Sequence, residues 1–106
     1  MSVIALQALA EETGGQLVGE SVALQTLAID SRKVKAGALF AALSGQRVDG
    51  HDFAPQALAA GASALLTERE LEGLAPQLVV ADVMAASGRF GALKRQAFEG
   101  KVIATK

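Results

Sequence analysis

Short apolar runs alternate with polar, glycine-containing segments along the chain, and this pattern predicts an α/β domain. Apolar residues at helical spacing predict a first helix over residues 4–12, with Ser2 as a candidate cap and Gly14 as its stop. A second helix is expected over 53–60, capped by Asp52 and ended by Gly61. Runs of strand length are expected at 16–18, 24–30, 38–43, 63–66, 77–81 and 101–105.

Residues 38–66 read as strand, loop, helix and strand, which predicts a βαβ unit with parallel pairing. The run at 38–43 is apolar throughout, as expected of a strand buried on both faces. We therefore expect a small mixed sheet with flanking helices, built around this βαβ unit.

A longer helix is predicted from Asp82, its cap, to about residue 98. Gly88 and Gly91 lower its helical propensity, which suggests that another backbone packs closely there. Its apolar stripe is expected to consist of Val83, Ala86, Phe90, Leu93 and Ala97.

Composition excludes several classes of protein. The 106 residues carry a net charge of −1, which argues against a general nucleic-acid or anionic-membrane binder. The chain has no cysteine and a single histidine, so thiolate chemistry and a two-histidine metal site are excluded. It also lacks Trp and Tyr for base stacking. No signal peptide or membrane span is recognisable, so the chain is expected to be soluble and intracellular.

Charge is distributed in blocks, and residues 31–51 hold Arg32, Lys33, Lys35 and Arg47 against Asp49 alone. Two loops, 30–33 and 45–51, contain all of these residues except Lys35. Each loop follows an apolar strand, and ligands bind beyond the carboxyl ends of such strands. Arg32 and Arg47 would serve as phosphate partners, with the Ser31 hydroxyl and the amides near Gly45 and Gly50 beside them. The expected ligand is a phosphorylated small molecule.

Simpler interpretations remain open for the same residues. The basic run can be a solvated loop, and the glycines can serve only a turn. His51 can be a capping residue as readily as a ligand contact. Asp49 and Asp52 are more simply turn and cap residues than a catalytic carboxylate pair, and no other catalytic constellation is evident.

The order of these motifs resembles the N-terminal domain of the Mur ligases, the ATP-dependent amide ligases of peptidoglycan precursor synthesis. The resemblance covers essentially the whole chain. It is carried by Asp-Ser-Arg at 30–32, the strand 38–43 with Ser44-Gly45, Asp-Gly-His-Asp-Phe at 49–53, Gln56-Ala57, Gly61-Ala62 and residues 64–66. The segment 76–82 is most similar to the members that add D-alanyl-D-alanine to UDP-N-acetylmuramoyl-tripeptide. Their sisters, which add the third (diamino) acid, are the close alternative.

The resemblance implies that this domain holds the UDP end of a UDP-muramyl-peptide. Ile29 and Ser31 lie at uridine-contacting positions, and Gln46, Arg47 and Val48 match the loop along the uracil and ribose. The residues expected to border the same site are Arg32, Asp49 and His51. No catalytic or metal-binding residue is expected.

The resemblance also implies a division of the chain. Residues 1–100 would form the UDP-substrate-binding domain, and 101–106 the first strand of an ATP-binding central domain, whose phosphate loop is absent. No cofactor is expected in this chain, whereas the full-length enzyme would use ATP and Mg²⁺. The expected partners are the UDP-muramyl-peptide and the central domain of the same polypeptide, in the bacterial cytoplasm, without nucleic acid or membrane. A free-standing binding module without ligase activity is the remaining alternative.

Overall fold

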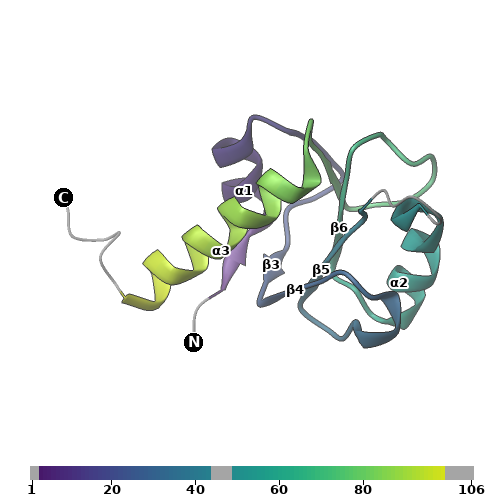
Figure 1. The fold of residues 1–106 in the computed structure, drawn as a ribbon, viewed down its shortest axis with the longest axis horizontal. Coiled ribbons are helices and arrows are strands. Elements are labelled where there is room, and N and C mark those ends of the chain that lie inside the picture. Colours follow the sequence, from purple (N-terminus) through teal and green to yellow (C-terminus); the bar gives the residue numbers. More distant parts are fainter. Residues whose placement is uncertain (1–2, 44–48, 100–106) are drawn as a thin grey trace.

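The computed structural model describes residues 3–43 and 49–99, which form a sheet with helices on both faces (Figure 1). The helices are α1, α2 and α3, and two short 3-10 helices, η1 and η2, precede β5 and α2. The helical elements are α1 (Leu6–Thr13), η1 (Ser31–Lys33), η2 (Gly50–Phe53), α2 (Ala54–Ala60) and α3 (Val83–Glu99). The strands are β1 (Ile4–Ala5), β2 (Gln16–Val18), β3 (Ala23–Leu24), β4 (Thr26–Ala28), β5 (Ala38–Ala41), β6 (Ala64–Thr67) and β7 (Gln77–Val79).

The main sheet has five strands in the order β2-β7-β6-β5-β4. β4, β5, β6 and β7 are parallel to their neighbours, and β2 pairs antiparallel with β7. β1 and β3 form a separate antiparallel pair. The mixed α/β sheet and the parallel βαβ unit formed by β5, α2 and β6 are therefore confirmed.

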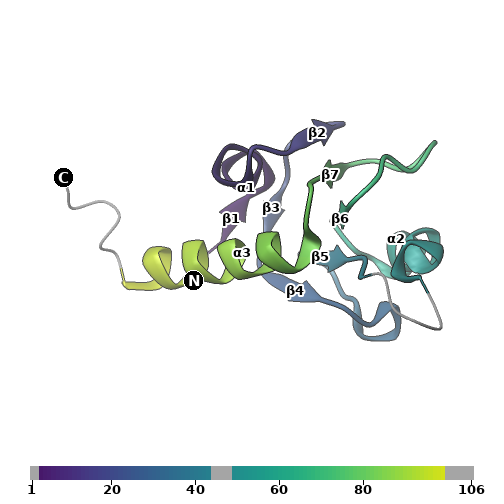
Figure 2. The ribbon, with the colours of Figure 1, turned by 45° about the horizontal axis from the view of Figure 1, so that its top comes forward.

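Each face of the sheet has its own apolar core. In β5, Leu39 and Ala41 belong to the core beneath α1 and α3, whereas Phe40 belongs to the core beneath α2. All four residues of β5 are buried, as the continuous apolar run predicts. Figure 2 shows α2 separated from α1 and α3 by the strands.

Several element boundaries differ from the sequence prediction. The predicted first helix begins at Leu6, because Ile4–Ala5 pairs with β3. The strand predicted over 24–30 is divided between β3 and β4. The strand predicted over 77–81 ends at Val79. The final strand predicted at 101–105 lies outside the described residues.

α3 follows the predicted cap, since the Ala85 N–H donates to Asp82 Oδ1 at 3.1 Å. The predicted close packing at Gly88 and Gly91 is wrong: a Cβ at either position would meet no described atom within 4 Å. Of the apolar stripe predicted for this helix, Val83, Ala86 and Phe90 are buried, whereas Ala97 is exposed. No helix in the described ranges is long and apolar enough to cross a membrane.

The turn before α2 is organised by Asp49 rather than by the predicted cap Asp52. Asp49 Oδ1 accepts from the His51 N–H at 2.9 Å and so caps η2, whereas α2 has Phe53 at its N-cap position and no side-chain cap. The Gly50 N–H donates to Leu43 O at 2.7 Å, and a Cβ on Gly50 would lie 2.6 Å from backbone atoms of Leu43. Glycine is therefore required for η2 to lie against the chain that leaves β5.

In β7, two strands from β5 and on the face that α2 covers, the buried side chain of Gln77 holds the loop between β6 and β7. Its Oε1 accepts from the Leu71 N–H at 2.9 Å, and its Nε2 donates to Leu71 O at 2.7 Å and Leu74 O at 2.5 Å. This amide replaces the water that would otherwise satisfy those backbone groups.

Gln77→Leu should therefore destabilise the fold by about 2–4 kcal/mol, because it removes three hydrogen bonds and leaves the half-buried Leu71 N–H and Leu74 C=O without their side-chain partner. Chemical denaturation measures this loss. Gln7→Leu, on the exposed face of α1, is the matched control and should change the free energy of unfolding by less than about 0.5 kcal/mol. Equal effects of the two substitutions would contradict the role assigned to Gln77.

The pH dependence of stability should reflect Asp49. Hydrogen bonds from the His51 N–H and from the His51 ring, followed by that from Arg69, hold the pKa of Asp49 well below its ordinary value. Because the pKa is lower in the folded state, this contribution is complete above the unfolded pKa, near 4, and is lost as the pH falls below it. Asp49→Asn should reduce stability at pH 7 and flatten the acid side of the profile. Asp52→Asn, at an exposed carboxylate of the same turn, is the control, and an unaltered acid slope in Asp49→Asn would refute the assignment.

Candidate functional site

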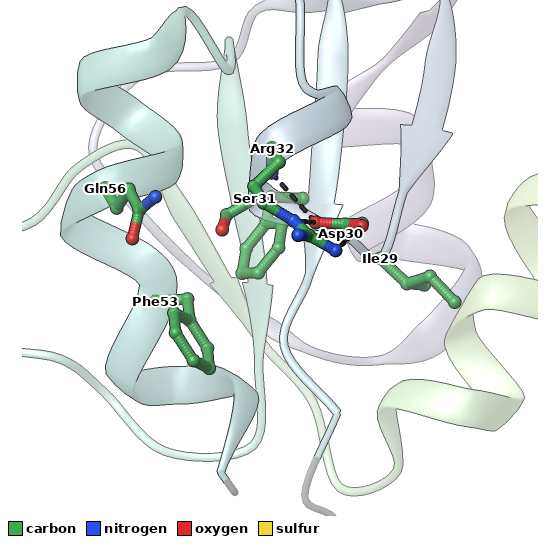
Figure 3. Close-up of a pocket in the computed structure, with 7 residues that line it drawn as sticks. Ile29, Asp30, Ser31, Arg32, Phe53 and Gln56 are labelled. Carbon is green, nitrogen blue, oxygen red and sulfur yellow. Dashed lines mark hydrogen bonds and ion pairs between the residues drawn. The ribbon is translucent and has the colours of Figure 1, made fainter.

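A cavity of about 530 Å³ opens beyond the carboxyl ends of β4 and β5, between η1 and α2 (Figure 3). Its volume is within the range of small-molecule sites. The lining residues are Ile29, Asp30, Ser31, Arg32, Phe40, Phe53 and Gln56. Three residues predicted from the sequence, Ile29, Ser31 and Arg32, therefore meet at one cavity.

Ser31 is held in place by the start of η1. Asp30 Oδ1 accepts from the Arg32 N–H at 2.9 Å and caps this 3-10 helix, with Ser31 as its first residue. Ser31 is 7% exposed, and its hydroxyl makes no hydrogen bond to residues 3–43 or 49–99. Figure 3 shows this hydroxyl directed toward the space between η1 and α2. It is a buried polar group that has hydrogen-bonding capacity left for a ligand.

Arg32 is held by the same carboxylate. Its Nε and Nη2 each donate to an oxygen of Asp30 at 3.2 Å, which leaves further guanidinium N–H groups available. The Arg32 hydrogen bond lowers the pKa of Asp30, and the same bond raises that of Arg32. The Arg32 side chain is 81% exposed at the cavity mouth, so it presents an oriented positive charge to an anion.

Two phenylalanines give the cavity its apolar walls. Phe40, in β5, is 1% exposed, whereas Phe53, at the end of η2, is 38% exposed. Neither phenylalanine was predicted from the sequence as a site residue, and Gln56 was used only for the family resemblance. Phe53 directly precedes α2 and Gln56 lies in its first turn. Their three-residue spacing places them on one side of this helical segment, and this was the signal that the sequence offered. Ile29, 62% exposed, lies at the rim and points away from Phe53 (Figure 3).

The other predicted site residues do not line this cavity. Gln46, Arg47 and Val48 lie outside the described residues. Arg69 Nη2 donates to Asp49 Oδ2 at 3.0 Å, and the side chain of His51 is 1% exposed. Their predicted place at the border of the site stays a prediction, and the structure gives both a role in the turn that carries Phe53.

The residues present do not fit the ATP and Mg²⁺ implied for the full-length enzyme. No group of three or more His, Cys, Asp or Glu side chains that could hold a metal ion occurs within 3–43 and 49–99. The sequence also contains no Gly-x-x-x-x-Gly-Lys-Ser/Thr loop. No step of ATP chemistry is therefore assigned to this chain.

Comparison with curated proteins gives matches along nearly the whole chain. It is 42% identical over 104 residues to the UDP-N-acetylmuramoyl-tripeptide–D-alanyl-D-alanine ligase of Escherichia coli, covering 98% of this chain and 23% of that protein. It is 45% identical over 75 residues to the UDP-N-acetylmuramoyl-L-alanyl-D-glutamate–2,6-diaminopimelate ligase of Geobacillus kaustophilus, covering 71% and 14% respectively. The chain thus spans less than a quarter of these relatives.

Solved structures agree in fold. The UDP-N-acetylmuramoylalanyl-D-glutamyl-2,6-diaminopimelate–D-alanyl-D-alanyl ligase of Acinetobacter baumannii superposes with a TM-score of 0.78 at 32% identity, covering 91% of this chain and 22% of that one. A family model described as "Mur ligase family, catalytic domain" matches residues 23–92, which include every residue that lines the cavity. With the motifs, the fold and the family model in agreement over most of its length, the chain belongs to the Mur ligase family.

Proposed function

We propose that this chain is the UDP-muramyl-peptide-binding domain of a ligase that joins D-alanyl-D-alanine to UDP-N-acetylmuramoyl-tripeptide. The uridine end would occupy the cavity beside Ser31, and Arg32 would face the diphosphate. The loop 46–48 would follow the uracil and ribose, and the protein would act in the bacterial cytoplasm. Ile29 would contact the nucleotide at the rim.

The observation that carries this proposal is the unused hydroxyl of Ser31 between apolar walls. A nucleobase has a flat face for Phe53 and polar edges for a hydroxyl, so it matches both features of the cavity. The oriented guanidinium of Arg32 at the mouth complements a phosphate attached to that nucleoside. The buried hydroxyl of Ser31 would therefore contact the base, and the exposed guanidinium of Arg32 would contact the phosphate.

Coverage favours the D-alanyl-D-alanine ligase over its sister. The match to the Escherichia coli protein extends over 98% of this chain, whereas that to the Geobacillus diaminopimelate ligase covers 71%. The sister activity is the second candidate, because the sequence identity to the Geobacillus protein over its shorter match is as high as that to the Escherichia coli protein. In either case the domain would anchor the non-reacting end of the substrate and contribute binding energy to its orientation.

Ser31→Ala should weaken UDP binding by about 1 kcal/mol, or roughly fivefold in Kd, because one hydrogen bond is removed. Calorimetric titration of the 106-residue chain with UDP measures this change. Ser87→Ala is the matched control, since that hydroxyl bonds Val83 O within α3 and lies outside the cavity. If both variants bind UDP as tightly as the unmodified chain, Ser31 is not in the site.

The ligase activity predicts what the parent gene encodes after Lys106. A phosphate loop of the type Thr-Gly-x-x-Gly-Lys-Thr/Ser is expected directly downstream. The full-length protein should then form an amide between UDP-N-acetylmuramoyl-tripeptide and D-alanyl-D-alanine with hydrolysis of ATP, measured as phosphate release. Release with a diamino acid and UDP-N-acetylmuramoyl-dipeptide instead would identify the sister activity, and a gene without the phosphate loop would exclude both.

A further inference from the structure

We propose that His51 is a positioning residue of this cavity: it fixes η2 so that Phe53 forms the cavity wall, and it does not contact the ligand. The inference rests on the proposed function only for the identity of the ligand. It assigns His51 a role different from the direct contact considered from the sequence.

Both ring nitrogens of His51 are already engaged. Nδ1 lies 2.7 Å from Asp49 Oδ1, and Nε2 accepts the Glu68 backbone N–H at 3.0 Å. Because Nε2 accepts, the ring proton is on Nδ1 and is donated to the carboxylate. With a side chain that is 1% exposed, His51 has no ring nitrogen left for a nucleotide.

These bonds join three segments that are distant in the sequence. Asp49 and His51 belong to the turn at η2, and Glu68 directly follows β6. Glu68 Oε2 also accepts from the Val83 N–H at 2.9 Å, at the first residue of α3. Arg69, beside Glu68, holds the second oxygen of Asp49. The charged groups around the ring are therefore Asp49, Glu68 and Arg69, with exposed Asp52 in the same turn.

Phe53 needs this support more than the opposite wall does. Phe40 is buried within a strand that has hydrogen-bonded neighbours on both sides, so the sheet fixes its ring. Phe53 is 38% exposed and belongs to a single 3-10 turn, in which the Ala54 N–H donates to His51 O. A displacement of His51 therefore displaces the residue that carries this wall of the cavity.

The experiment is a double-mutant cycle on UDP affinity with the 106-residue chain. His51→Leu keeps much of the volume but loses both hydrogen bonds, and it should raise the Kd for UDP about threefold to tenfold. His51→Gln retains an acceptor near the position of Nε2 and should restore part of the affinity. In a Phe53→Leu background, His51→Leu should have little further effect, because the two residues act through one wall. Additive effects on affinity, or an unchanged Kd in folded His51→Leu, would overturn the proposal.

Gln77→Leu is the matched control, since it removes a buried hydrogen-bonding side chain in β7, two strands from β5 and outside the cavity lining, and should leave the Kd unchanged. A comparable loss of affinity in Gln77→Leu would mean that general destabilisation explains the effect of His51.

If the unmodified chain does not bind UDP, the proposed function fails, and the ring-proton resonances of Phe53 test the positioning role separately. They should shift in His51→Leu and less in His51→Gln, and unchanged resonances would refute the positioning role.

Discussion

β5 is covered on both faces, so its four residues carry no polar side chain. Polar side chains that could bind a ligand can therefore occur only beyond the carboxyl end of this strand. The parallel register with β4 brings the end of that strand to the same edge. The segments that follow, η1 with Ser31 and η2 with Phe53, consequently face each other across the cavity. The position of the site is thus determined by the burial of β5 and by its register with β4.

The sequence was informative where a local pattern determines the structure. A continuous apolar run between glycines predicted β5 and the βαβ unit, and strand ends predicted where Ser31 and Arg32 would gather. The sequence was uninformative where a contact depends on backbone that is distant along the chain. Nothing near His51 indicates that its Nε2 accepts an amide proton from a residue 17 positions away. Likewise, glycine propensity could not show that Gly88 faces open space within the described structure.

The basic block that the sequence showed at 31–51 is divided by the fold. Arg32 is paired with Asp30, and Asp49, the one acid of the block, is held by His51 and Arg69. Lys33 and Lys35 line an adjoining hollow along β4, which shares Ile29 and Asp30 with the cavity. Among the residues that the structure describes, an anion at the cavity mouth would therefore meet the oriented guanidinium of Arg32 instead of a diffuse positive surface, which favours recognition by hydrogen-bond geometry over general electrostatic attraction.

The two walls of the cavity differ in how they are held, and this difference bears on binding. A domain that holds the far end of a substrate contributes most to orientation when its contacts are formed before the ligand arrives, because ordering a wall on binding subtracts from affinity. Phe40 meets this requirement through the sheet. Phe53 belongs to a short turn with little burial of its own. The His51 ring and the Arg69–Asp49 pair tie that turn to the segment after β6, and Glu68 ties this segment to α3. Affinity at this cavity should therefore depend on residues that never touch the ligand.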